Sequence, residues 1–160
     1  MEGALPPPRT PEEDDLARIC ASLNAKGALY VVIGGMAMNQ HGMLRATADI
    51  NLLIESSREN QARVLKALEV LPDKAVREVR ETDLDEYVVV RVADEIVIDL
   101  MLKACGVTYA EAQGEIESRK INGVDIPIAS APLLLRTKQT YRERDIPDRL
   151  FLQRKLQREG

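Results

Sequence analysis

Residues 30–54 read YVVIGGMAMNQHGMLRATADINLLI, and the order of signals in this stretch decides the fold that we expect. The stretch opens with an apolar, β-branched run, which predicts a short buried strand. Gly34-Gly35 interrupts that run, and residues 36–41 then predict a short helix that ends at a further glycine. Residues 48–54 predict a second strand. A strand, a glycine turn, a short helix and another strand therefore follow one another.

The Gly34-Gly35 turn is a place where an anionic group can approach the backbone. A helix that begins at Gly35 presents unpaired N–H groups and the positive end of its dipole, and both favour a phosphate. Glycine also allows a close approach because it has no side chain. A glycine pair after a strand also serves simply as a tight turn, so both interpretations stay open from these residues alone.

Three oxygen-bearing side chains of the expected strands form a candidate metal site. Asp49 and Asn51 lie on one face of their strand, because side chains alternate along a strand. Asp99 belongs to EIVIDLM, an otherwise apolar run that predicts another strand. Mg²⁺ prefers oxygen ligands, typically one or two carboxylates together with substrate phosphates. A buried Asp99 needs a metal, hydrogen bonds or a cation, so an ion pair with Arg45 or Arg91 is the alternative.

Local signals place the other helices and strands. Thr10-Pro11 marks a helix start, with Thr10 as the N-cap, Pro11 at the first helical position and Glu13 at the capping-box position. Asn122-Gly123 is the strongest short hairpin signal, and residues 93–94 form a second connection of hairpin length. We expect helices over residues 11–26, 59–71, 131–142 and from 146 onward, and strands over 76–80, 86–92, 95–101, 115–121 and 124–128. The sequence thus predicts the α/β or α+β class, with a mixed β-sheet flanked by helices.

Composition limits the class of protein further. The chain has 160 residues, 45% hydrophobic and 30% charged, which predicts one domain over residues 11–160 after a flexible, proline-rich arm over residues 1–10. A net charge of −4 argues against broad nucleic-acid affinity, although residues 136–158 are locally basic. Two cysteines and one histidine argue against structural zinc. Without a membrane span or signal peptide in the sequence, we expect a cytoplasmic protein.

The combination of these motifs resembles the nucleotidyltransferase superfamily related to DNA polymerase β. The family pattern is a strand, Gly-Gly or Gly-Ser, a helix, Asp-x-Asp on the next strand and a third Asp on a later strand. Thirteen residues separate Gly35 from Asp49, which is the usual family spacing. The run HGMLRATADINLLI is similar to HG-x-x-R-x-T-x-DIDLLV of small bacterial members in toxin–antitoxin and abortive-infection systems. The likeness continues through residues 126–130, then Lys138, Asp145 and Asp148.

The resemblance implies a fold and a chemistry. It implies a nucleotidyltransferase-like fold with C-terminal helices, and transfer of a nucleoside monophosphate from an NTP to a protein or RNA acceptor with release of pyrophosphate. ATP is the expected nucleotide, so AMP would be the group transferred. Mg²⁺ or Mn²⁺ is the expected ion. A cognate toxin is the protein partner that the resemblance suggests.

Candidate roles for individual residues follow from the matched positions and their neighbours. Asp49 and Asp99 are the catalytic candidates, and Asp99 would help to activate the attacking hydroxyl. The candidate metal ligands are Asp49, Asn51 and Asp99. The candidates for phosphate contacts lie at the glycine turn, just before the metal strand, or on a C-terminal helix: Gly34, Gly35, Arg45, Thr47 and Lys138.

Asn51 is where the chain departs from the family pattern. A neutral amide stands in place of the second carboxylate, which lowers the charge available to hold two dications. We therefore expect weak metal binding and low or absent turnover. The alternative is a non-catalytic module that binds nucleotide or another protein, such as an antitoxin-like partner.

Three of the C-terminal candidates also have ordinary structural interpretations. Lys138 can be a solvated residue on an amphipathic helix. Asp145 and Asp148 are spaced as in a capped first helical turn, and we interpret them as helix caps rather than metal ligands.

Overall fold

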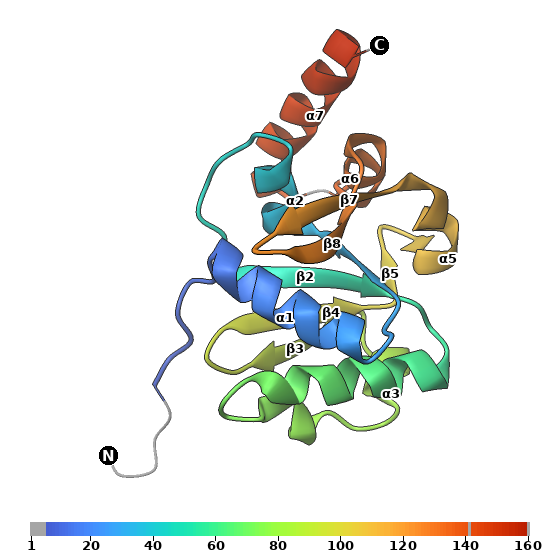
Figure 1. Cartoon of the computed structure of the whole chain (residues 1–160). Coiled ribbons are helices and arrows are strands. Elements are labelled where there is room, and N and C mark those ends of the chain that lie inside the picture. Colours follow the sequence, from blue (N-terminus) through green and yellow to red (C-terminus); the bar gives the residue numbers. More distant parts are fainter. Residues whose placement is uncertain (1–5, 141, 160) are drawn as a thin grey trace.

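The computed structural model of the chain describes residues 6–140 and 142–159. Its framework is a six-stranded mixed sheet with the strand order β3-β4-β2-β1-β8-β7 (Figure 1). β1 is parallel to β8 and β2 is parallel to β4, whereas the other neighbouring strands of this sheet are antiparallel. The strands are β1 (Tyr30–Ile33), β2 (Asp49–Ile54), β3 (Val90–Ala93), β4 (Val97–Met101), β5 (Lys103–Ala104), β6 (Val107–Thr108), β7 (Ile116–Ile121) and β8 (Val124–Ala129).

The helices lie on the faces and at one end of the sheet. The α-helices are α1 (Glu13–Ala25), α2 (Gly34–Gln40), α3 (Arg58–Ala67), α4 (Asp83–Glu86), α5 (Tyr109–Ala112), α6 (Ala131–Thr137) and α7 (Ile146–Glu159). The 3-10 turns are η1 (Leu68–Val70), η2 (Ala75–Glu78), η3 (Gln113–Glu115) and η4 (Glu143–Asp145). In Figure 1, α1 crosses one face of the sheet with α3 beside it, and α2 and α6 lie toward the end from which α7 projects.

The hydrophobic core holds the strands in place. All four residues of β1 are buried, since this strand lies between β2 and β8. On α1, Leu16, Ile19 and Leu23 recur at helical spacing and are fully buried. Burial of each such side chain contributes about 1.5–3 kcal/mol. The strands are therefore a rigid support for the polar side chains that they carry.

The predicted fold class and both predicted hairpins are confirmed. β3 and β4 form one antiparallel pair, and β7 and β8 form the other. Asn122 and Gly123 have φ values of +52° and +77°, the positive values that a two-residue hairpin turn of this kind requires.

The start of the first helix differs from the prediction. Its N-cap is Glu12, and the Asp15 carboxylate accepts the Glu12 N–H at 2.8 Å. The same carboxylate binds both terminal nitrogens of Arg9 at 2.7 Å. The prediction of Thr10 as the N-cap is therefore wrong. Residues 1–5 of the predicted arm lie outside the described residues.

The strand predicted over residues 76–80 is wrong, because this segment contains the 3-10 turn η2. The cause is a contact distant in sequence. The Asp94 carboxylate accepts the backbone N–H groups of Asp73 at 3.0 Å and Ala75 at 2.8 Å. These bonds stabilise a turn just before the segment, and the chain continues from it into η2 rather than into a strand.

Other predicted elements are shorter than expected. The strand predicted from residue 86 begins at Val90, since residues 83–86 form α4. The helix predicted over residues 131–142 ends at Thr137. Between residues 102 and 115, for which the sequence predicted no element, the chain forms β5, β6 and α5.

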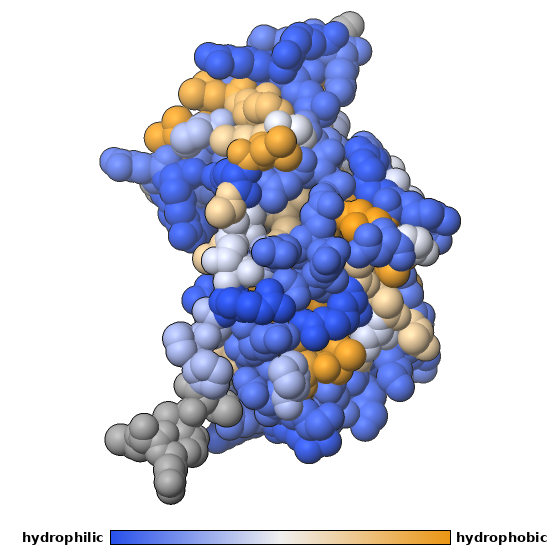
Figure 2. All heavy atoms as spheres, turned by 60° about the vertical axis from the view of Figure 1, so that its left-hand side comes forward, coloured by the Kyte–Doolittle hydropathy of each residue, from blue (hydrophilic) through white to orange (hydrophobic). Residues whose placement is uncertain are grey.

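The surface is largely hydrophilic in Figure 2, with hydrophobic side chains gathered below the tip of α7. Two exposed apolar residues, Ile146 and Leu150, belong to α7. A hollow of about 700 Å³ beside them is lined by residues of α7 alone, so no second element shapes it. No helix within the described ranges is long and apolar enough to cross a membrane.

Candidate functional site

The candidate residues gather in one cleft of about 530 Å³. It is lined by the end of β1, the start of α2 and β2, parts of β3 and β4, and the segment that joins α6 to α7. All eight residues singled out in the sequence line this cleft: Gly34, Gly35, Arg45, Thr47, Asp49, Asn51, Asp99 and Lys138. Since they are separated by up to about a hundred positions in sequence, their convergence is a property of the fold.

The sheet register places the polar side chains of the strands side by side. Asn51 of β2 pairs with Asp99 of β4, and Asp99 pairs in turn with Arg91 of β3. Asp49 lies two residues before Asn51 and therefore on the same face. Two carboxylates, an amide and a guanidinium thus line the same cleft.

Arg91 is the ion-pair partner of both acidic residues. Its Nε donates to Asp99 Oδ1 at 2.9 Å, and its Nη2 donates to Asp99 Oδ2 at 3.0 Å. The same Nη2 reaches Asp49 Oδ2 at 3.2 Å. Of the two partners considered for Asp99 from sequence, Arg91 is therefore correct. Arg45 is not, because it binds Asp148 instead.

The two carboxylates crowd each other despite this guanidinium. Burial, followed by the neighbouring Asp99 carboxyl, raises the pKa of Asp49, and Arg91 offsets only part of the rise. A raised pKa means that the negative form of Asp49 is disfavoured where it stands. The site therefore favours an added cation near these oxygens.

The residues present fit one divalent cation better than two. Arg91 acts as a stand-in cation here, because one of its nitrogens contacts both carboxylates. The Asn51 amide is the third oxygen on the same face, and it carries no charge. Within the described part of the chain, no group of three or more His, Cys, Asp and Glu side chains could hold a metal. Asp49, Asp99 and Asn51 would thus supply two charged ligands and one neutral ligand.

Asp49→Asn is expected to raise the free energy of unfolding at neutral pH by up to about 1 kcal/mol, a small gain because solvent screens a partly exposed carboxylate. In the folded state the pKa of Asp49 lies above its ordinary value of 3.8. The wild type therefore loses stability as the pH rises through that raised pKa. Urea unfolding of both proteins across pH checks this. The stability gain of Asp49→Asn should vanish at pH values below the ordinary pKa of Asp49. A variant that is less stable than the wild type at neutral pH would contradict this prediction.

The glycine turn is shaped by the side chains that cover it. Gly34 has a φ of +70°, and a Cβ there would overlap the Asn51 amide nitrogen. A Cβ added at Gly35 would overlap the Thr47 side chain, and it would lie 2.9 Å from the Thr47 Cβ. Glycine is therefore required at both positions for close packing. The phosphate contacts expected here stay a prediction.

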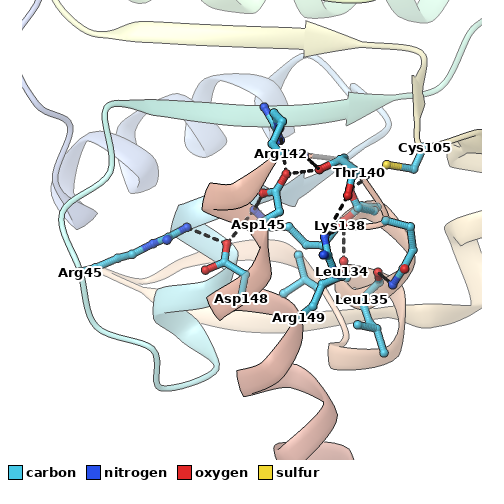
Figure 3. A network of polar contacts seen from close by, with 12 residues as sticks. Arg45, Cys105, Leu134, Leu135, Lys138, Thr140, Arg142, Asp145, Asp148 and Arg149 are labelled. Atoms are coloured by element: carbon cyan, nitrogen blue, oxygen red, sulfur yellow. Dashed lines mark hydrogen bonds and ion pairs between the residues drawn. The ribbon is translucent and has the colours of Figure 1, made fainter.

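A second group of charged residues connects the segment between α6 and α7 with Arg45, and several of its members line the cleft (Figure 3). Asp148 is fully buried, and its Oδ2 binds Lys138 Nζ at 2.9 Å and Arg45 Nη2 at 2.8 Å. Asp145 binds Arg142 Nε at 2.8 Å and Lys138 Nζ at 3.5 Å. Lys138 is itself buried, so its interpretation as a solvated residue is wrong.

The two aspartates are ion-pair partners rather than the helix caps that their spacing predicts. Burial alone would raise the pKa of Asp145, but hydrogen bonds from Thr140 and Arg142 and the charge of Lys138 hold it below the ordinary value. Asp145 therefore stays ionised in the folded protein. With Asp148, it keeps the cations of the C-terminal segment next to the cleft.

Sequence reasoning did not single out several residues of the cleft. Arg142 and Arg144 line it, and the basic character of residues 136–158 was the signal that could have identified them. Lys103 also lines it, from β5, where the sequence predicted no element. Arg91 was considered from sequence only as an ion-pair partner of Asp99, and the β3–β4 register brings it to the cleft.

Comparison with known proteins supports the fold. No family model matches the chain, and no curated protein matches it in sequence. A crystal structure of a "putative nucleotidyltransferase" from Thermotoga maritima superposes with a TM-score of 0.57, covering 92% of this chain and 93% of that chain at 17% sequence identity. Identity this low shows the fold alone. The chain has a nucleotidyltransferase-like fold.

Proposed function

We propose that the cleft binds a nucleoside triphosphate, ATP being expected, together with Mg²⁺ or Mn²⁺. The chain would transfer the nucleoside monophosphate to a hydroxyl of a protein or RNA acceptor. The observation that carries this proposal is the gathering of all eight candidate residues around one cleft of about 530 Å³. That volume lies within the range of small-molecule and cofactor sites, about 300–1,000 Å³.

The charge of the cleft supports a polyanionic ligand. Its lining has six cationic residues, Arg45, Arg91, Lys103, Lys138, Arg142 and Arg144, against three carboxylates, Asp49, Asp99 and Asp145, an excess of three positive charges. The cations come from the strands, from the segment before β2 and from the segment between α6 and α7. This arrangement suits a triphosphate better than a neutral or cationic substrate.

Each group would have a distinct part in the transfer. When bound, the divalent ion would neutralise charge on the reacting phosphate. Asp49 and Asp99 would hold that ion through their carboxylates, and Asp99 would accept the proton of the attacking hydroxyl. Lys138 and Arg45 would orient the phosphates. The hydroxyl oxygen would bond to the α-phosphorus as the bond to the leaving pyrophosphate breaks.

A second candidate function is nucleotide binding without catalysis, for example as the antitoxin-like partner of a toxin. Two observations favour it. Asn51 lowers the negative charge of the site, and Arg91 already pairs with both remaining carboxylates. The two functions differ in whether turnover occurs, so one experiment separates them.

The test is calorimetric titration with ATP and Mg²⁺, followed by incubation with α-phosphate-labelled ATP. We expect the wild type to bind ATP and transfer label slowly. Asn51→Asp should bind the divalent ion about tenfold more tightly, because one added ligand charge near the ion contributes more than 1.4 kcal/mol. Label transfer should increase with it.

Gln153→Glu is the matched control, since it makes the same amide-to-carboxylate change at an exposed position of α7 outside the cleft. It should leave ion affinity and labelling unchanged. If Asn51→Asp alters neither, the site assignment is wrong. If binding occurs but neither protein labels an acceptor, the non-catalytic function is correct.

A further inference from the structure

The Arg91 guanidinium occupies the place where the two acidic side chains converge. It approaches Asp99 through two nitrogens, at 2.9 and 3.0 Å, and Asp49 through one, at 3.2 Å. The β3–β4 register sets this geometry, because Arg91 pairs directly with Asp99. The contact between Arg91 and Asp99 is therefore determined by the pairing of their strands.

The charges around this place are unusual for a site meant to gather two dications. Asp49 and Asp99 contribute two negative charges, Asn51 contributes none, and Arg91 adds one positive charge. With a carboxylate at position 51 and without the arginine, the site would carry three negative charges. As it stands, its net charge is one negative charge. Both departures reduce the attraction for a second divalent ion.

We propose that Arg91 takes the place of one of the two divalent ions of a two-metal site. The cleft then binds a nucleoside triphosphate with a single divalent ion and one guanidinium. This assignment rests on the proposed nucleotide binding. It makes Arg91 a direct contact of the bound phosphates and sets the ion count of the complex at one.

The guanidinium can contact a phosphate without releasing both carboxylates. It carries five N–H donors, and its contacts with the carboxylates use Nε and Nη2. Among the described residues, Nη1 has no hydrogen-bond partner. The Arg91 side chain is 61% exposed and lines the cleft, so this nitrogen is accessible to a ligand. Arginine is also well suited to phosphate because of its planar fork of donors.

The test is a count of bound Mn²⁺ by electron paramagnetic resonance, with a non-hydrolysable ATP analogue at saturation. We expect one ion per protein in the wild type and in Asn51→Asp, because Arg91 still fills the second place. Asn51→Asp combined with Arg91→Met should bind two. Without divalent ions, Arg91→Met should bind the analogue about tenfold more weakly, as expected for loss of a charge-assisted hydrogen bond.

Arg119→Met is the matched control, since Arg119 also lies on a strand, β7, but outside the cleft. It should match the wild type in ion count and analogue affinity. Two ions in the wild type or in Asn51→Asp alone would overturn the role of Arg91. Those two proteins decide the question even if the double variant does not fold. Failure of the analogue to bind the wild type at all would instead refute the proposed function.

Discussion

Asp148→Ala is expected to lower the free energy of unfolding by about 3–5 kcal/mol, the loss typical when a buried ion pair is deprived of one partner. Asp148 is fully buried and binds Lys138 at 2.9 Å and Arg45 at 2.8 Å. The Lys138 side chain is only 9% exposed, so its ammonium would remain buried after the substitution. Asp145, at 3.5 Å from the ammonium, would compensate only part of that charge.

Urea unfolding followed by circular dichroism measures this loss. Asp125→Ala is the matched control, because Asp125 is 70% exposed and lies 3.6 Å from an exposed Lys120. An exposed pair of this kind contributes at most about 1 kcal/mol. Asp148→Asn should fall between the two, since the amide keeps the volume and one acceptor oxygen. A loss below about 1 kcal/mol for Asp148→Ala would mean that water replaces the carboxylate.

The same contact illustrates what local sequence signals cannot reveal. Arg45 and Asp148 are 103 positions apart, and nothing near either residue indicates the other. The spacing of Asp145 and Asp148 favours helix capping, which is a local interaction. Burial of Lys138 beside them makes an ion pair more favourable, because an unpaired buried ammonium is costly. Tertiary packing thus overrides the local preference.

The candidate site was predictable to the extent that strand parity and glycine turns determine it. Alternation places Asp49 and Asn51 on one face, and the structure keeps them there. The partner of Asp99 was not determined, because the choice between Arg45 and Arg91 depends on which strands pair and in which register. Arg91 lies directly opposite Asp99 only because β3 and β4 pair through the short turn at residues 94–96.

Helix and strand boundaries depend on the same kind of remote contact. The segment 76–80 contains β-branched residues that favour a strand, yet the Asp94 carboxylate closes a turn just before it. Hairpins were easier to predict, since Asn122-Gly123 encodes its own turn geometry. Features whose cause is local were therefore accessible from sequence, and features whose cause is long-range were not.

Gly34→Ala is expected to combine a stability loss of about 2–4 kcal/mol with loss of ligand binding. An L-residue at a φ of +70° costs about 1–2 kcal/mol by itself. The added Cβ would also overlap the Asn51 amide nitrogen and lie 3.1 Å from its Cγ. Asn51 must then move, which costs further packing energy and displaces a candidate metal ligand. The expected binding defect is at least tenfold for ATP with Mg²⁺, because a 1.4 kcal/mol loss of ligand contacts corresponds to that factor.

Gly27→Ala separates the two causes. Gly27 has the same φ of +70°, but nothing lies within 4 Å of an added Cβ, so this variant measures backbone strain alone. Gly34→Ala should lose at least about 1 kcal/mol more by urea unfolding, the typical minimum for overpacking. In an Asn51→Ala background the overlapping amide is absent and only a 3.2 Å contact with the Cβ of residue 51 remains, so the cost of Gly34→Ala should fall most of the way to that of Gly27→Ala. Equal costs in both backgrounds would mean that Asn51 does not pack over the turn. The glycine would then be required only for its backbone conformation, and the contact between the turn and Asn51 of β2 would be absent.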